Sequence, residues 1–259
     1  MKNHLSEDGR PTDGAGGYSV LEAMIAAALG ALIIGAALDV FVTHHRQFRA
    51  QRNTAEQQQA LRGGAHLLTS ELRLAGAGGL EEHPPVLTMG PDEVSFRANV
   101  NGVRGSLVAP AAAGQDRVQV SPGAGWAKGK TVLVCGAPGC EEHLLEHDGS
   151  SGRLILSGLL AKDFPKGSRV EVLNLVRYYV SRRDPKNTKL MREVDHGANP
   201  LIDHVEEFSL TYLNKHGRPT GRAEEVRLIR VNIQTSSNDA RGGRVNRSHH
   251  QDMGVRAFI

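Results

Sequence analysis

The chain has 259 residues, a formal net charge of +3, 30 glycines and few aromatic side chains. This length can hold one membrane-spanning helix and either one sizeable or two small globular domains. The net charge is too small to indicate nucleic-acid binding by itself. The sequence contains no glycine-rich phosphate-binding loop and no nucleophile elbow. The abundant glycine favours β-rich structure with many turns.

An uninterrupted apolar segment begins close to the N-terminus. Residues 23–38 contain no charged side chain, no proline and no side-chain amide, and Glu22 stands directly before them. A helix over residues 20–42 would be about 35 Å long, enough to cross a hydrocarbon core of about 30 Å. A secretory signal peptide fits poorly, because the apolar run is too long and no small-residue cleavage site follows it. A plain N-terminal signal anchor stays open as an alternative.

The helical pattern continues beyond the apolar segment. Apolar residues recur at steps of four and three: Leu61, Ala65, Leu68, Leu72 and Ala75. This spacing predicts one apolar face that packs on another part of the protein. Because Gly76 and two further glycines follow, and then two prolines, we predict one helix from about residue 18 to about residue 74. Gly63 and Gly64 are a weak point within it.

After residue 80 the pattern changes to short apolar runs separated by Gly, Pro and Asp turns, which predicts β-strands. We predict strands over residues 94–100, 117–120, 131–135, 153–156, 169–181, 207–213, 227–234 and 253–258. A shift between Leu173 and Val176 suggests a β-bulge, and the segment 238–250 lacks periodicity and predicts a loop. A long helix followed by antiparallel strands gives an α+β fold, with the amphipathic half of the helix laid on a sheet.

The residues before the apolar run resemble the class III signal of type IV pilins and pseudopilins. Gly17 stands at the cleavage point, Tyr18 is the aromatic first mature residue, and Glu22 is the fifth. The resemblance implies that a prepilin peptidase cuts after Gly17 and that Tyr18 is N-methylated. It also implies that Glu22 pairs with the freed amine of a neighbouring subunit, because an unpaired carboxylate in apolar surroundings is costly.

The C-terminal half is similar to the PilW-type minor pilins. The likeness is carried by Val-Arg-Tyr-Tyr-Val at 176–180, Leu-Met-Arg-Glu at 190–193, and the segments 200–213 and 226–231. The GspJ-type pseudopilins of type II secretion share much of this layout and are the alternative.

The resemblance divides the chain into a prepilin leader (1–17), a transmembrane half-helix (18–43), an amphipathic half-helix (44–79) and a periplasmic β-rich domain (80–259). It implies a non-enzymatic inner-membrane protein without a cofactor, which joins a pilus or pseudopilus near its tip. The expected partners are other minor and major pilins and the prepilin peptidase, with a tip adhesin as a further candidate. Charge alone favours the opposite orientation weakly, because basic residues follow the apolar run while the leader holds three acids and two bases.

Two cysteines, Cys135 and Cys140, are separated by Gly-Ala-Pro-Gly. In an oxidising periplasm a disulfide is the default. The alternative is a zinc site made of Cys135, Cys140, His143 and His147, in a membrane-anchored metal-binding domain or enzyme. That site would need a helix over 141–147 to place both histidines on one face, whereas the acidic residues there indicate a solvated loop.

A basic tract lies near the C-terminus and holds Arg241, Arg244, Arg247, His249 and His250. It is interpreted as a solvated loop, since no aromatic residues are interleaved with the charges. Contact with DNA or another anionic surface is the alternative, and nucleic acid is not an expected partner.

Overall fold

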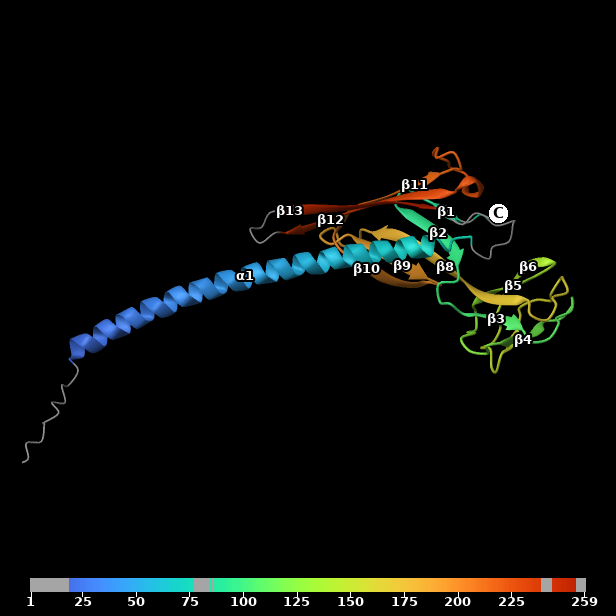
Figure 1. Cartoon of the computed structure of the whole chain (residues 1–259), viewed down its shortest axis with the longest axis horizontal. Helices are drawn as coiled ribbons and strands as arrows, with labels where there is room; N and C mark the ends of the chain where they lie inside the picture. Colours follow the sequence, from blue (N-terminus) through green and yellow to red (C-terminus); the bar gives the residue numbers. More distant parts are fainter. Residues whose placement is uncertain (1–18, 77–83, 85, 239–243, 255–259) are drawn as a thin grey trace, which may run out of the picture. The chain divides into compact units, whose positions relative to one another are not determined.

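The computed structural model of the chain describes residues 19–76, 84, 86–238 and 244–254 (Figure 1). The chain forms two compact units, residues 1–50 and 51–259. The helix α1 (Val20–Leu72) starts in the first unit and ends in the second, close to the bounds that the sequence predicts. Gly76 follows it with a φ of 77°, a conformation that ends helices and that glycine adopts without strain.

The second unit contains two antiparallel sheets besides the last turns of α1. The ten-stranded sheet consists of β1 (Thr88–Met89), β2 (Glu93–Ala98), β3 (Arg104–Leu107), β4 (Arg117–Ser121), β5 (Thr131–Gly136), β6 (Gly139–Leu144), β7 (Arg153–Ile155), β8 (Arg169–Ser181), β9 (Lys189–Val194) and β10 (Gly197–Ile202). The three-stranded sheet consists of β11 (Val205–Leu213), β12 (Leu228–Asn238) and β13 (Arg244–Gly254), with a short 3₁₀ helix, η1 (Ala223–Glu225), before β12. The predicted α+β fold is confirmed.

The longest strand of the ten-stranded sheet, β8, connects two groups of strands. Its residues 169–173 pair with β3 and β5, and its residues 174–181 pair with β2 and β9. These pairings run without a register shift, so the bulge predicted between Leu173 and Val176 is wrong. The apolar alternation is interrupted because a polar residue, Asn174, occupies a fully buried position.

Hydrogen bonds satisfy the buried Asn174. Its amide donates to Asp195 at 2.7 Å and accepts from the backbone of Val100 at 3.2 Å. Asp195 also accepts from Lys130 at 2.6 Å and from the amide of Leu175 at 2.8 Å. Burial of Asp195 opposes its ionisation, but these three hydrogen bonds outweigh burial and hold the pKa of its carboxyl below the ordinary value.

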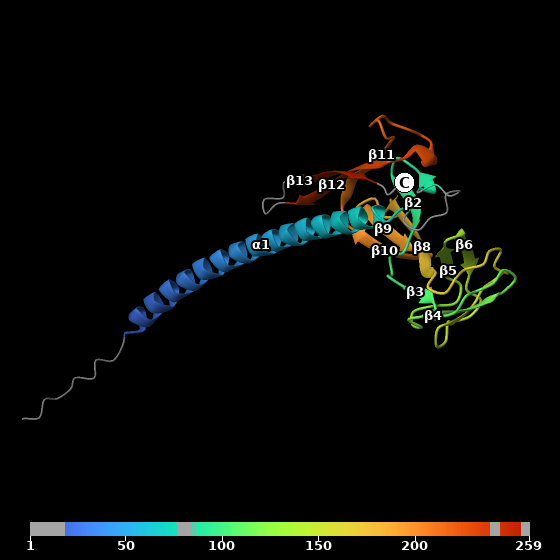
Figure 2. The ribbon, with the colours of Figure 1, turned by 45° about the vertical axis from the view of Figure 1, so that its right-hand side comes forward.

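Two hydrophobic cores lie within the second unit. The first joins the last turns of α1 to both sheets, and β2, β8, β11 and β12 supply most of the strand residues (Figures 1 and 2). The second lies among β4, β5, β7 and the first part of β8, around Trp126. In the first core the predicted helix stripe is confirmed, because each of its members is at most 5% exposed: Leu61, Ala65, Leu68, Leu72 and Ala75.

The two adjacent helix glycines face different surroundings. A Cβ added at Gly64 would lie 2.5 Å from Cγ1 of Ile202 on β10, whereas a Cβ added at Gly63 would meet nothing within 4 Å. The helix continues through both residues. Gly64 is therefore the point at which α1 comes close to β10, and a side chain there would keep the two elements apart.

The C-terminal part of the chain corrects one prediction, the loop over residues 238–250. The strand β13 spans Arg244–Gly254 and pairs with the whole of β12, from Leu228 opposite Gly254 to Asn238 opposite Arg244. The loop predicted over 238–250 is therefore wrong for residues 244–250, which belong to β13. Of the strand predicted over 253–258, residues 253 and 254 lie in β13, whereas residues 239–243 and 255–259 lie outside the described part. Within the described strands β13 is an edge, and edge strands carry polar and charged residues instead of a clear apolar alternation.

Candidate functional site

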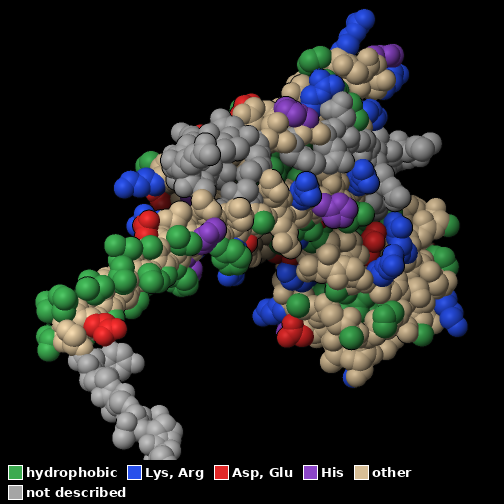
Figure 3. Space-filling view, turned by 60° about the vertical axis from the view of Figure 1, so that its left-hand side comes forward, with side chains coloured by type: hydrophobic (Ala, Val, Ile, Leu, Met, Phe, Trp, Pro, Cys, Tyr) green, Lys and Arg blue, Asp and Glu red, His purple; other side chains and the backbone are tan. Residues whose placement is uncertain are grey.

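The first half of α1 is apolar and exposed. Between Glu22 and Asp39 it carries no charged side chain, and the large apolar residues from Val20 to Phe41 are all more than half exposed. Figure 3 shows hydrophobic side chains gathered along this part of the helix. By length and composition α1 can cross a membrane. The exposed apolar surface needs lipid or another protein to cover it.

The start of α1 places one carboxylate at the edge of this apolar surface. Ser19 begins the helix: its side-chain oxygen accepts from the amide of Leu21 at 3.2 Å, and its carbonyl accepts from Ala23 at 3.1 Å. Glu22 lies in the first turn, where the helix dipole favours a negative charge. Within residues 19–76 the Glu22 carboxylate has no hydrogen-bond or ion-pair partner, so it can accept one from outside. Gly17 and Tyr18 lie outside the described residues, and their processing stays a prediction.

Small residues interrupt the apolar surface of α1. They include Ala26, Ala27, Ala28, Gly30, Ala31, Gly35 and Ala36. A Cβ added at Gly30 or Gly35 would meet nothing within 4 Å, so the backbone is open at both positions. A second helix can approach closely at such positions.

A buried ion pair with an additional hydrogen bond holds the C-terminal end of α1 against the ten-stranded sheet, and the sequence did not predict it. Glu71 is 5% exposed and accepts from Nε of Arg192 on β9 at 2.9 Å and from the hydroxyl of Tyr178 on β8 at 2.5 Å. The hydrogen bond to Glu71 raises the pKa of the Arg192 guanidinium. Burial, together with the Glu71 charge, raises the pKa of the Tyr178 hydroxyl, so the tyrosine stays a donor. The only sequence signal was an acid beside the apolar stripe of α1.

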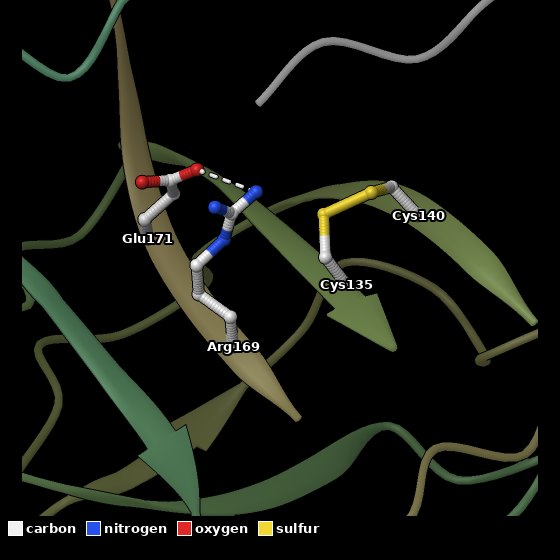
Figure 4. The surroundings of a disulfide bond; sticks show 4 residues. All are labelled: Cys135, Cys140, Arg169 and Glu171. Atoms are coloured by element: carbon white, nitrogen blue, oxygen red, sulfur yellow. Dashed lines mark ion pairs between the residues drawn. A yellow bond between two sulfur atoms is a disulfide. The ribbon is translucent and has the colours of Figure 1, made fainter. Parts of the chain in front are cut away.

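The predicted disulfide is confirmed. Cys135 at the end of β5 bonds to Cys140 at the start of β6, across a hairpin turn in which Gly136 faces Gly139 (Figure 4). On the neighbouring strand β8, Arg169 and Glu171 form an ion pair at 3.4 Å (Figure 4). The hairpin register brings the two sulfur atoms together because the cysteines are direct cross-strand neighbours.

The alternative zinc site is not brought together. Both sulfur atoms are in the disulfide, and residues up to Leu144 form the strand β6 instead of a helix. His143 lies 3.3 Å from the Glu141 carboxylate, while His147 is exposed beyond the strand. Among the described residues, no group of three or more His, Cys, Asp or Glu side chains is placed to hold a metal ion.

The basic tract near the C-terminus belongs in part to β13. Arg244, Arg247, His249 and His250 lie on this strand, and the side chain of His250 is exposed. Arg241 lies outside the described residues. The strand assignment corrects the loop interpretation and leaves contact with DNA untested.

Comparison of the chain with protein-family models, with curated proteins and with solved structures finds no match. The layout itself, a long apolar N-terminal helix followed by an antiparallel sheet, is compatible with a pilin-like fold.

Proposed function

We propose that this chain is a minor pilin of a type IV pilus that acts in assembly priming or in the tip complex. The observation that carries the proposal is the two-part character of α1. Its first half is exposed and apolar with one carboxylate in the first turn, and one face of its last turns, from Leu61 onward, is buried against the β-sheets. A pseudopilin of a type II secretion system would use the same parts in a different machine.

In the proposed assembly, the first half of α1 moves from lipid into a bundle of similar helices. There Glu22 would pair with the amine that cleavage frees on Tyr18 of a neighbouring subunit. Two opposite charges about 4 Å apart attract by about 4 kcal/mol at an effective dielectric constant of about 20. Because a misaligned helix would leave both charges unpaired in apolar surroundings, the pair favours one axial register.

The second half of α1 would carry the β domain with the helix. The apolar stripe buries one face, Gly64 permits close approach to β10, and Glu71 binds Arg192 and Tyr178. Removing any one of these contacts would loosen the last turns of α1 from the sheets. The proposal therefore assigns membrane insertion and assembly to the first half of the helix, and attachment of the domain to the second.

The substitution Glu22→Ala tests the proposal. It removes one member of the inferred pair and makes the helix more hydrophobic, so membrane insertion should persist or improve. Cleavage should also persist, because it depends mainly on Gly17 and its neighbours. Co-purification with partner pilins should fall, whereas the matched variant Asp39→Ala, which removes a carboxylate from the other end of the apolar segment, should retain it.

Three readouts separate the outcomes: membrane level, N-terminal processing and co-purified pilins. Normal co-purification by the Glu22→Ala protein would remove Glu22 from its assigned role. Loss of that protein from the membrane would indicate a folding or topology defect instead. Because paralogous minor subunits can compensate in cells, co-purification is more informative than piliation.

A further inference from the structure

A cluster of basic side chains follows the apolar half of α1. This basic collar consists of His44, His45, Arg46 and Arg49, and all four side chains are exposed. No acidic residue lies between Asp39 and Glu56 in the sequence. Among the described residues Arg46 and Arg49 have no ion-pair partner, whereas Arg52 further along pairs with Glu56 at 2.8 Å. The unbalanced positive charge is therefore concentrated in the collar.

The basic collar lies at the depth of lipid headgroups if the apolar segment spans the hydrocarbon core. At 1.5 Å per residue, Arg46 is about 6 Å and Arg49 about 10 Å beyond Val42, the last residue of the apolar segment. The headgroup layer on each side of a bilayer is roughly 5–8 Å thick. Arginine can adjust its position within this layer, because its long stem lies along apolar surface while its guanidinium reaches polar groups.

The arrangement of the basic collar around the helix suits a ring of headgroups. At about 100° per residue the four side chains spread over about 200° of the helix circumference. A single neighbouring helix would cover a narrower part of the circumference than this. Two exposed aromatic residues accompany the collar: Phe41 precedes it and stacks on His45 with ring centroids 5.8 Å apart, and Phe48 lies between the two arginines in sequence. Aromatic side chains are common where a helix leaves the hydrocarbon core.

Membrane topology does not explain the basic collar. A disulfide such as Cys135–Cys140 is typical of proteins in an oxidising compartment, which favours the periplasmic side for the β domain, and the collar follows the apolar segment on that same side. The positive-inside rule favours basic residues on the opposite, cytoplasmic side. Positive charge that opposes the rule needs a counter-charge of its own, and anionic headgroups at the membrane surface supply one.

We infer that the basic collar binds the phosphates of anionic phospholipids in the leaflet that borders the β domain, an inference that rests on the membrane-spanning role proposed for α1. These contacts hold the inserted subunit at one depth before assembly, with Arg46 and Arg49 as the main ligands. Each arginine near a charged surface strengthens lipid binding roughly fivefold.

Native mass spectrometry of the full-length protein in nanodiscs tests this inference. The nanodiscs contain phosphatidylethanolamine with phosphatidylglycerol as the minor lipid. We expect the wild-type protein to retain phosphatidylglycerol at roughly fivefold or more above its share of the bilayer. The double variant Arg46→Gln/Arg49→Gln, which keeps good helix formers, should fall close to the bulk ratio. The matched control Arg62→Gln/Arg73→Gln removes two exposed arginines further along the chain and should keep the enrichment.

The outcomes separate this inference from the proposed function. A wild-type protein that inserts but retains both lipids at the bulk ratio overturns lipid binding and leaves the proposed function standing. A protein that does not insert overturns both. An unchanged lipid ratio in the collar variant, together with reduced co-purification of partner pilins, assigns the collar to an acidic partner helix and also overturns the inference.

Discussion

Alanine at each of the two adjacent helix glycines should change stability in opposite directions. Both substitutions remove the conformational freedom that glycine gives the unfolded chain, a gain of about 0.5–1 kcal/mol in a helix. At Gly63 nothing lies within 4 Å of the new Cβ, so Gly63→Ala should stabilise the protein by about that amount.

At Gly64 the new Cβ would lie 2.5 Å from Cγ1 and 2.8 Å from Cδ1 of Ile202, which is 2% exposed. Relieving this overlap requires the buried Ile202 side chain to leave its position or α1 and β10 to move apart, and overpacking of this kind costs about 1–3 kcal/mol. Gly64→Ala should therefore destabilise the protein by about 0–2.5 kcal/mol, despite the gain in helix propensity.

Urea unfolding of the full-length protein in detergent, followed by circular dichroism, measures both variants. The free energies of unfolding of the two variants should differ by about 1–3 kcal/mol. Equal stabilisation by the two alanines would refute the close approach of α1 to β10, because it would mean that Gly64 has as much space as Gly63.

Further predictions concern the buried network, the disulfide and the acid side of the stability profile. Glu71→Gln should destabilise the protein by about 2–4 kcal/mol. This cost is slightly smaller than the cost of breaking a fully buried ion pair, because a quarter of the Arg192 side chain is exposed. In a double-mutant cycle with Arg192→Gln, purely additive effects would refute the pairing. Cys135→Ser should cost about 1–3 kcal/mol because the closed loop is short, and two titratable thiols in protein exported to the periplasm would contradict the disulfide. Since the pKa of Asp195 is lowered on folding from its ordinary 3.8, its stabilisation is present above about pH 4 and lost as the pH falls through the folded value. Asp195→Asn should flatten this part of the profile, and an unchanged slope from urea unfolding at each pH would refute it.

Local patterns in the sequence were sufficient to predict a helix or strand where one face of that element is buried. The stripe from Leu61 to Ala75 marks the side of α1 that meets the sheets, because every apolar residue in it faces the same way. The strand β8 was predicted with its observed bounds, Arg169–Ser181, since apolar residues alternate on both sides of the buried Asn174. Cys135 and Cys140 were paired correctly because the chain contains only these two cysteines and the Gly-Ala-Pro-Gly segment between them can form a tight turn.

Other features depend on residues far apart in the chain. Glu71 binds Tyr178 and Arg192, which are 107 and 121 residues away in sequence, so no local pattern predicts the network. The β9–β10 hairpin was missed because few of its residues are buried and its turn uses Asp195 and His196 at positive φ, where glycine or asparagine would have been a clearer signal.

For the candidate site at Glu22, the sequence determines the position of the carboxylate but not its partner. The position of Glu22 at the start of the apolar surface was predictable from the sequence, because it follows from the order of residues along one helix. The partner proposed for Glu22 would belong to another subunit, so it would leave no pattern in this chain.

The N-terminus of the mature protein tests the central claim most directly. Mass spectrometry of protein purified from its native membrane should give a chain that begins at Tyr18 and carries a methyl group on the terminal amine. Gly17→Arg should prevent this cleavage, because a large charged side chain does not fit a site that accepts glycine. A mature chain that begins at Met1, or one cut after the apolar segment, would contradict the assignment as a pilin-like subunit.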